Sequence, residues 1–184
     1  MKAKNIIIGI TGSIAAYKAC DLISQLKRNG HSVTVVMTRE AEEFITLLTL
    51  ETLSGNRAYR DMFQLPDKRE VIHVSLARKA DIIVVCPATA NIIGKLAGGI
   101  CDDLLTCTII SSASPVLIVP AMNDNMYRHE TTRKNIRELR KIGYKFVEPI
   151  HGNLACGSVG IGHIAGLKEI AVKINKILAQ PRRG

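Results

Sequence analysis

The sequence has no tryptophan, and only 4% of its 184 residues are aromatic. Nucleic-acid-binding proteins commonly stack bases on aromatic side chains and gather basic residues into a patch. Here 25 Lys and Arg residues, which contribute to a formal net charge of +9, are scattered along the chain. This pattern argues against nucleic-acid binding. It leaves two interpretations open, a solvated basic surface or one that attracts small phosphorylated molecules.

Long apolar runs and paired cysteines are also missing. No run approaches the roughly 20 apolar residues of a membrane-spanning helix, and the first residues show no signal-peptide pattern, so we expect a cytoplasmic protein. The five cysteines contain no CxxC pair and no zinc spacing, and an odd number argues against a disulfide framework. His151, Cys156 and His163 are close in sequence, but the intervening glycines are not ligands and no carboxylate joins them, so we expect no metal.

The residues that are present suit one compact domain. Hydrophobic residues make up 47% of the chain, which is enough for a sizeable core. A length of 184 residues is typical of a single domain. We therefore expect residues 1–184 to form one domain.

Strand-like apolar runs alternate with helical patterns along the chain. We predict strands at 5–11, 32–37, 81–86, 115–120 and 144–148. We predict helices at 14–29, 41–54, 89–97, 103–112, 130–142 and 167–179, the first capped by Ser13 and ended by Gly30. The alternation predicts an α/β fold, a three-layer open parallel sheet of Rossmann or flavodoxin-like type. Segments 55–72 and 150–166 are irregular, and their length favours functional loops.

Ligands in such folds bind beyond the carboxyl ends of the strands, so the residues that follow each strand are site candidates. Thr11-Gly12-Ser13 opens a helix and suits a phosphate, although an ordinary helix cap explains it equally well. The dinucleotide GxGxxG pattern is missing, and Thr38 stands where an acid would bind a ribose. The sequence therefore favours a mononucleotide over NAD.

Two further strand ends carry small or soft residues. In 87–91 the small side chains allow a flat ring to approach the backbone, although a turn with a helix cap is the alternative interpretation. In 120–126 the amide of Asn123 lies between Met122 and Met126, which form a soft apolar wall. Core packing would explain the methionines, but it would not explain Asn123.

The histidines and one cysteine complete the candidates. We expect His31 at the surface and His129 in a structural role at the start of a helix. His73 precedes a helix-like stretch, and Arg78 either binds an anion or faces solvent. Segment 152–162 places Cys156 among four glycines, which we interpret as a flap that brings a thiol to a bound molecule.

Taken together, these motifs resemble the homo-oligomeric flavin-containing cysteine decarboxylases. The likeness runs from residue 5 to about 178 and rests on six segments in order: 12–18, 37–38 with Phe44, the region of His73, 87–91, 120–126 and the Cys156 loop. The resemblance implies noncovalent FMN near a subunit contact. It also implies assembly of the chain with itself into trimers or dodecamers of trimers.

The resemblance assigns roles to individual residues. His73 would be the catalytic base, supplied by a neighbouring subunit, Asn123 would hold the substrate carboxylate, and Cys156 would donate a proton. The phosphate of FMN would contact Gly12, Ser13 and Thr38. The full cofactor set implied is Gly12, Ser13, Ile14, Thr38, Phe44, Ala88, Thr89, Ala90, Asn91 and Ala121, and the substrate set is Arg78, Asn123, Met126, Asn153, Leu154 and Ala155.

The activity implied by the resemblance is FMN-dependent decarboxylation of 4′-phospho-N-pantothenoylcysteine to 4′-phosphopantetheine in coenzyme A biosynthesis. The substrate thiol is oxidised to a thioaldehyde, CO₂ leaves, and the reduced flavin returns electrons to the enethiol. Alternatives are a decarboxylase of C-terminal peptide cysteines, a flavin prenyltransferase and a flavin-binding regulatory subunit. The Leu-Ala-Cys-Gly loop favours the small substrate, and intact His73, Asn123 and Cys156 argue against the regulatory subunit.

Two features depart from the pattern of bacterial members of this family. His163 stands where many carry Arg, and Ile164 where Met often follows. The synthetase half to which this domain is often fused is missing from the sequence. We therefore expect either a stand-alone enzyme, with a possible separate synthetase partner, or a truncated bifunctional protein.

Overall fold

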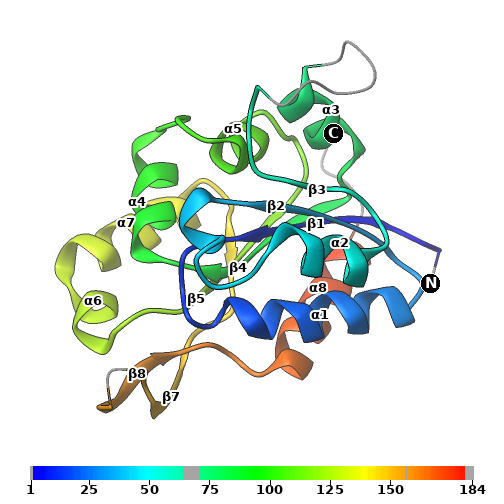
Figure 1. The fold of residues 1–184 in the computed structure, drawn as a ribbon. Coiled ribbons are helices and arrows are strands. Elements are labelled where there is room, and N and C mark those ends of the chain that lie inside the picture. The colour runs from blue at the N-terminus through cyan, green and yellow to red at the C-terminus, as the bar shows by residue number, and fades with distance from the viewer. Residues whose placement is uncertain (1, 64–70, 156, 181–184) are drawn as a thin grey trace.

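The computed structural model describes residues 2–63, 71–155 and 157–180 (Figure 1). Its centre is a six-stranded parallel sheet with the order β3-β2-β1-β4-β5-β6. Apolar runs such as Ile6-Ile7-Ile8 are buried because helices cover both faces of the sheet. The strands are β1 (Asn5–Ile10), β2 (Ser32–Met37), β3 (Ala58–Tyr59), β4 (Ile82–Ala88), β5 (Val116–Pro120) and β6 (Lys145–Phe146).

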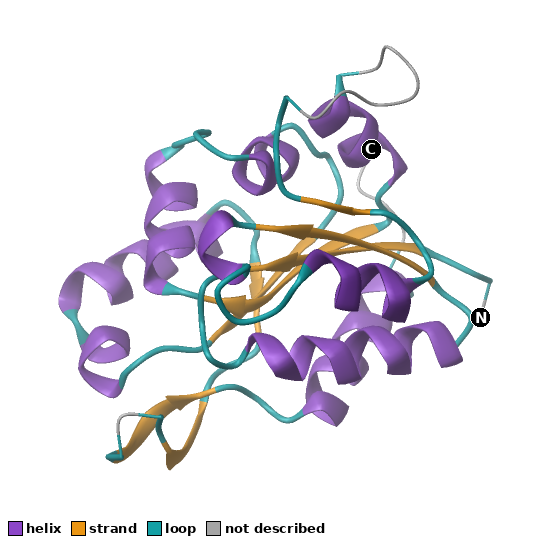
Figure 2. Cartoon of the chain, in the orientation of Figure 1, coloured by secondary structure: helices purple, strands orange, loops and turns teal. Residues whose placement is uncertain are grey.

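Helices form the two outer layers (Figure 2). One face packs against α1 (Ala16–Arg28), α2 (Leu47–Ser54) and α8 (Leu167–Leu178). The other packs against α3 (Ile72–Lys79), α4 (Ala90–Gly98), α5 (Leu104–Ile110) and α7 (Glu130–Lys141). This arrangement confirms the predicted three-layer α/β fold, and the strand order is that of the Rossmann type. No helix in the described ranges is both long and apolar enough to cross a membrane.

The start of α1 differs from the prediction. Its N-cap is Ala15, which makes no side-chain cap, so Ser13 is not the helix cap. A turn intervenes instead, because the Ser13 amide donates to the Thr11 carbonyl (2.8 Å) and the Ala16 amide donates to the Ser13 carbonyl (2.8 Å). Gly30, at φ +84°, lies just beyond the helix as predicted.

Two histidines test the predictions at the ends of elements. His129 caps α7, where its Nδ1 accepts from the Thr131 amide (3.3 Å), so its structural role is confirmed. His31 precedes β2 and is only 5% exposed, so its predicted surface position is wrong. Neither of its ring nitrogens has a hydrogen-bond partner among the described residues. Burial, followed by the charge of the chain's N-terminus, lowers the pKa of this imidazole.

The two segments predicted to be irregular contain regular structure. Segment 150–166 holds an antiparallel hairpin of β7 (Ile150–Asn153) and β8 (Val159–His163). Segment 55–72 holds β3 and the beginning of α3, and residues 64–70 lie outside the described ranges. The short elements η1 (Arg39–Ala41) and α6 (Asp124–Arg128) follow β2 and β5 at the carboxyl edge of the sheet.

Candidate functional site

The carboxyl ends of β1 and β4 are joined by one buried hydroxyl. Thr11 Oγ1 donates to the Pro87 carbonyl (2.8 Å) and accepts from the Thr89 amide (3.1 Å). The Ala121 amide then donates to the Ala88 carbonyl (3.0 Å), which fixes the end of β5 beside that of β4. Because the strand order reverses between β1 and β4, this is the switch point at which open α/β sheets bind ligands.

A cavity of about 500 Å³ opens at this point. Its volume falls within the range of small-molecule sites. The cavity brings together residues from four parts of the sequence that are far apart, and they include ten of the predicted site residues. The ten are Gly12, Ser13, Ile14, Thr89, Ala121, Asn123, Met126, Asn153, Leu154 and Ala155.

Gly12 has a steric reason to be glycine. A Cβ atom at this position would lie 2.5 Å from Cβ of Glu40 and 3.2 Å from its carbonyl oxygen. The loop after β1 can therefore contact the loop after β2 only without a side chain at residue 12. Glu40 also lines a neighbouring cavity of about 700 Å³, together with Thr38.

Thr38 carries an unpaired hydroxyl at the end of β2. Its side chain is 7% exposed, and Oγ1 is buried with no hydrogen-bond partner among the described residues. Buried polar atoms are rarely left unpaired, so such an atom at a strand end indicates a ligand group. A mononucleotide phosphate would fit here. Gly12 leaves room for it, the Thr38 hydroxyl could donate to it, and the helix that follows residue 13 would favour its charge.

The hairpin closes the cavity by docking on the segment after β5. The Met122 amide donates to the Gly162 carbonyl (3.1 Å), and the Ile161 amide donates to Asp124 Oδ1 (3.0 Å). A Cβ on Gly162, at φ +151°, would lie 2.0 Å from the Met122 carbonyl oxygen, and one on Gly160 would lie 2.7 Å from Cβ of Asp124. Gly160 and Gly162 therefore allow β8 to pack closely against the segment after β5. Their interpretation as part of an irregular loop was wrong.

Asn123 lies where the docked segment enters α6. Its Oδ1 accepts from the Asn125 amide (2.9 Å), so the side chain caps the helix. Asp124 beside it holds the hairpin and accepts from Arg128 Nε (2.7 Å). The hydrogen bond from Arg128 is the main cause of the lowered pKa of Asp124. The amide of Asn123 is thus held in one orientation at the wall of the cavity.

The structure adds a pair of residues that had no predicted role. Lys18 Nζ lies 2.8 Å from His163 Nε2, and His163 Nδ1 lies 3.1 Å from the Asn153 carbonyl oxygen. Because an ammonium can only donate, Nε2 accepts the bond from Lys18 and Nδ1 carries the proton toward Asn153. Among the described residues that line the cavity, Lys18 is the only Lys or Arg, and none is Asp or Glu.

The pair links α1 to the hairpin across 145 positions of sequence. Lys18 ends the motif at 12–18, but nothing in the sequence relates it to a residue so far away. The signal that could have found it is position, because Lys18 lies in the first turn of α1, directly after the strand-end loop that holds Gly12.

Several predicted site residues do not line the cavity. His73 and Arg78 lie on α3, far from the hairpin in Figure 1, and His73 Nδ1 is buried with no partner among the described residues. Phe44 is 46% exposed beyond η1. Cys156 lies outside the described residues. Of the remaining three, Ala88 is fully buried in β4, and Ala90 and Asn91 form the first turn of α4.

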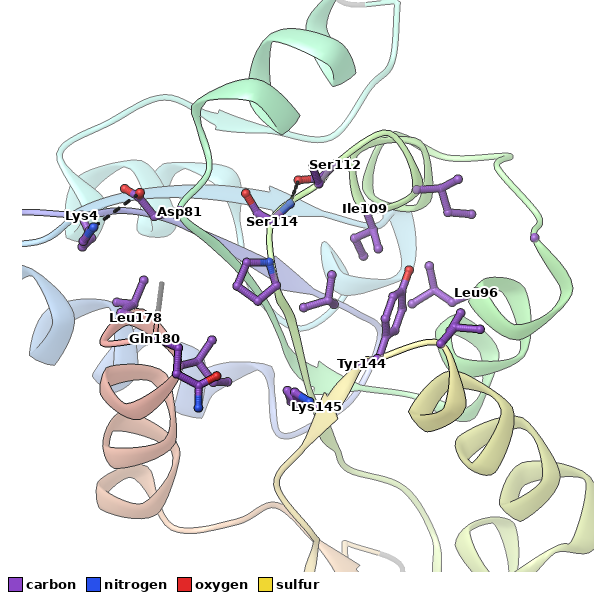
Figure 3. A pocket seen from close by; sticks show the side chains of 18 residues that line it. Lys4, Asp81, Leu96, Ile109, Ser112, Ser114, Tyr144, Lys145, Leu178 and Gln180 are labelled. Atoms are coloured by element: carbon purple, nitrogen blue, oxygen red, sulfur yellow. Dashed lines mark hydrogen bonds and ion pairs between the residues drawn. The ribbon is translucent and has the colours of Figure 1, made fainter. Parts of the chain in front are cut away.

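A larger hollow lies at the other edge of the sheet, near the starts of β1, β4, β5 and β6 (Figure 3). Its volume is about 760 Å³. Several of its polar groups are already paired: Lys4 contacts Asp81 (3.8 Å), and Ser114 Oγ donates to the Ala80 carbonyl (2.6 Å). We therefore assign the site to the smaller cavity at the carboxyl edge. Within the described ranges, no group of three or more His, Cys, Asp or Glu side chains is arranged to hold a metal ion.

Comparison with known proteins identifies what the chain is similar to. The model of the flavoprotein family matches residues 1–179. The chain is 44% identical over 177 residues to the coenzyme A biosynthesis bifunctional protein CoaBC of Bacillus subtilis, covering 96% of this chain and 44% of that protein. It is 41% identical over 177 residues to a probable phosphopantothenoylcysteine decarboxylase of Streptococcus mutans, covering 95% and 99%. The chain thus spans less than half the length of the bifunctional relatives that it matches.

Solved structures give the same picture. A mutant PPC decarboxylase complexed with pantothenoylaminoethenethiol superposes with a TM-score of 0.86 at 28% identity, covering 97% of this chain and 100% of that one. The FMN-dependent cysteine decarboxylase SpaF superposes with a TM-score of 0.82 at 27% identity, covering 97% and 98%.

Proposed function

The chain belongs to the flavoprotein family, and on that premise we propose that it is an FMN-dependent decarboxylase of 4′-phospho-N-pantothenoylcysteine. The observation that carries the proposal is the single cavity that joins residues 12–14, 121–126 and 153–155. The similarity to the Streptococcus mutans protein, which extends over 99% of that protein, supports the substrate class. The fold shared with the pantothenoylaminoethenethiol complex supports it further.

The residues at the strand ends fit the cofactor. Gly12, Ser13 and Thr38 would hold the FMN phosphate, and Thr38 Oγ1 would gain the partner that it lacks among the described residues. Thr89 and Ala121 would line the space beside the ring. When bound, FMN supplies two-electron oxidation of the substrate thiol and the later return of those electrons.

The chain's own residues would bind and orient the substrate. Asn123, held by its bond from the Asn125 amide, would hold the substrate carboxylate. Met126 and Leu154 would exclude water from the reacting atoms, which strengthens polar interactions at the cavity wall. Lys18, held by His163, would attract the anionic groups of the substrate. Arg78 lies outside this cavity, so a substrate role for it would depend on a second copy of the chain.

Two proton transfers complete the proposal. His73 would act as the base and would enter the site from a neighbouring subunit, because α3 lies away from the cavity of its own chain. Its Nδ1 is buried without a hydrogen-bond partner among the described residues, which is consistent with a partner supplied by a second copy of the chain or by a ligand. Cys156, whose sequence neighbour Ala155 lines the cavity, would return a proton to the decarboxylated product.

The proposal is tested by adding FMN to the purified protein, recording its flavin absorbance and measuring CO₂ release from phosphopantothenoylcysteine. A peptide ending in cysteine serves as the competing substrate, because the fold is also shared with FMN-dependent cysteine decarboxylases such as SpaF. Failure to bind FMN would overturn every flavin assignment. Faster turnover of the peptide would overturn the small substrate alone.

The role of Cys156 is tested separately with Cys156→Ser. This variant should still release CO₂, but the enethiol product should accumulate because no thiol returns the proton. Mass spectrometry of the product distinguishes the enethiol from 4′-phosphopantetheine. If the variant formed 4′-phosphopantetheine at the wild-type rate, Cys156 would not be the donor.

A further inference from the structure

Cys101 and Cys107 take no part in the proposed reaction, yet the fold brings them together. Cys101 lies in the loop between α4 and α5 and is exposed, whereas Cys107 lies within α5 and is partly buried. Cys107 Sγ donates to the Cys101 carbonyl (3.3 Å), and Cys101 Sγ donates to the Gly99 carbonyl (3.8 Å). Desolvation raises the pKa of the Cys107 thiol, and the adjacent Cys101 raises it further, through its charge and a hydrogen bond between the side chains.

We propose that Cys101 and Cys107 form a reversible dithiol–disulfide site that low-molecular-weight disulfides oxidise. The proposal is independent of the decarboxylase assignment. Its basis is that Cys107 Sγ lies 3.3 Å from the carbonyl oxygen of Cys101, on a loop and a helix that are adjacent in the chain, so the second thiol lies against the residue that carries the first. Disulfides in proteins of reducing compartments are usually transient rather than structural.

The other described cysteines show why this pair is distinct. Cys86 is fully buried in β4, and burial raises the pKa of its thiol to about 12. Cys20 is partly buried on α1, and burial followed by the charge of Asp21 raises its pKa. The buried thiol of Cys86 is therefore out of reach of a small disulfide, and Cys20 lies on a different helix from Cys107. Among the described cysteines, Cys107 alone has a thiol that donates to the backbone of another cysteine.

The difference in exposure sets the order of the reaction. The exposed Cys101 thiolate attacks a small disulfide RSSR, which forms a mixed disulfide and releases one RSH after proton uptake. Cys107 then loses its proton and attacks the Cys101 sulfur, which expels the second RSH. In total, two protein thiols and one RSSR become one protein disulfide and two RSH, so atoms and electrons balance.

The bridge would constrain one rim of the cavity that Thr38 lines. Between the two cysteines, Asp102 and Asp103 hold Lys95 at 2.8 Å and 2.9 Å, and all three residues line that cavity with Thr38. Asp103 also caps α5 by accepting from the Thr106 amide (2.8 Å). Oxidation would therefore close a small ring around residues that contact the second cavity.

The test uses the intact protein, oxidised glutathione and mass spectrometry. Trypsin releases residues 96–128 as one peptide whose only cysteines are Cys101 and Cys107. After oxidation and alkylation, this peptide should carry no alkyl group and two hydrogens fewer than the reduced form. Dithiothreitol should restore alkylation of both thiols. The peptide 19–27, which contains Cys20, should be alkylated before and after oxidation.

Single variants test the order of attack. Cys107→Ser should accumulate glutathione on Cys101, because no second thiol resolves the mixed disulfide. Cys101→Ser should leave Cys107 largely unmodified over the same time. Both changes are close to isosteric, and retained far-ultraviolet circular dichroism verifies folding. An unmodified wild-type peptide, or glutathione on both cysteines without a bridge, would overturn the proposal.

Discussion

The hollow at the amino edge of the central sheet and the cavity that Asn123 lines at the carboxyl edge differ in their polar groups. The hollow at the amino edge is larger, about 760 Å³ against about 500 Å³. It is lined by the Lys4–Asp81 ion pair and by serines that donate to nearby carbonyls. At the carboxyl edge the smaller cavity is lined by the docked hairpin, by Asn123, which caps α6, and by Lys18, which has no carboxylate partner among the described residues.

This difference shows that polar groups available to a ligand identify a site better than the volume of the cavity does. At the amino edge, Lys4 pairs with Asp81 and the hydroxyls of Ser112 and Ser114 donate to carbonyls, so a ligand would have to compete with bonds that already exist. At the carboxyl edge, Thr38 Oγ1 is buried without a partner among the described residues, and Gly12 permits a close approach between two loops. Parallel strands also direct ligands to this edge.

The largest expected effect concerns His73, which belongs to neither hollow of its own chain. His73→Asn should retain FMN and lose about 10²–10⁴-fold in decarboxylation, the usual contribution of an acid–base group. Stopped assays of CO₂ release and the flavin spectrum measure the two quantities.

A mixing experiment makes this prediction sharper. If one subunit supplies His73 and another supplies Cys156, co-expression of His73→Asn with Cys156→Ser should restore part of the activity that neither variant has alone. Mixed oligomers without any recovered formation of 4′-phosphopantetheine would place both residues in the same subunit, contrary to our proposal.

The next effect concerns the hairpin that distinguishes the carboxyl edge. Gly162→Ala places a Cβ 2.0 Å from the Met122 carbonyl oxygen at φ +151°, so the hairpin must move. We expect a loss of more than about 2 kcal/mol in docking or unfolding free energy and a large rise in KM. Gly166→Ala is the matched control, because no atom lies within 4 Å of its Cβ position. Equal denaturation midpoints and equal KM for the two variants would show that the hairpin does not depend on this contact.

Lys18 and Lys4 offer a direct comparison of the two edges. Lys18→Met should raise KM for the phosphorylated substrate about tenfold, since a hydrogen bond to a charged group contributes about 1.5–3 kcal/mol. Lys4→Met removes the same charge from the amino edge, where it only contacts Asp81, and should leave KM unchanged. A larger effect of Lys4→Met would reverse the assignment of the two hollows.

The smallest effect is the pH dependence that arises from His31. Burial lowers the pKa of its imidazole from the ordinary value of 6.5, so below that pH the unfolded chain binds a proton that the folded chain resists. Stability should therefore be complete above pH 6.5 and fall as the pH drops below it. In His31→Phe, urea midpoints between pH 7 and pH 5.5 should vary less than in the wild type. Identical slopes would remove His31 as a cause.

The sequence predicted the fold well where burial alone decides the structure. Strands such as β1 and β5 are continuous apolar runs, and the face of α1 repeats at helical spacing, so no tertiary information was needed. The hairpin was missed because its glycines carry no strand preference. It is held by docking, through the Met122 amide and the Asp124 carboxylate. His31 was misplaced because a histidine after a glycine is usually exposed, whereas this one is covered by packing.

The candidate site divides in the same way. The sequence predicted the strand-end motifs with Gly12 and Asn123, and the hairpin residues such as Asn153. One cavity brings these residues together. Three features were not predicted: Lys18 pairs with His163, the hydroxyl of Thr38 has no partner in the described ranges, and Cys107 Sγ contacts the Cys101 carbonyl. Each depends on side chains that meet only after folding.

The sequence by itself determined the layered α/β fold and the chemical groups at the strand ends, because hydrophobic periodicity and the fixed direction of parallel strands are local properties of the chain. Only the tertiary structure decided which groups share a cavity and at which edge of the sheet a polar atom lacks a hydrogen-bond partner among the described residues. It also decided that His73 lies away from the cavity of its own chain. Those properties depend on distances between residues far apart in sequence, which packing sets and local patterns do not record.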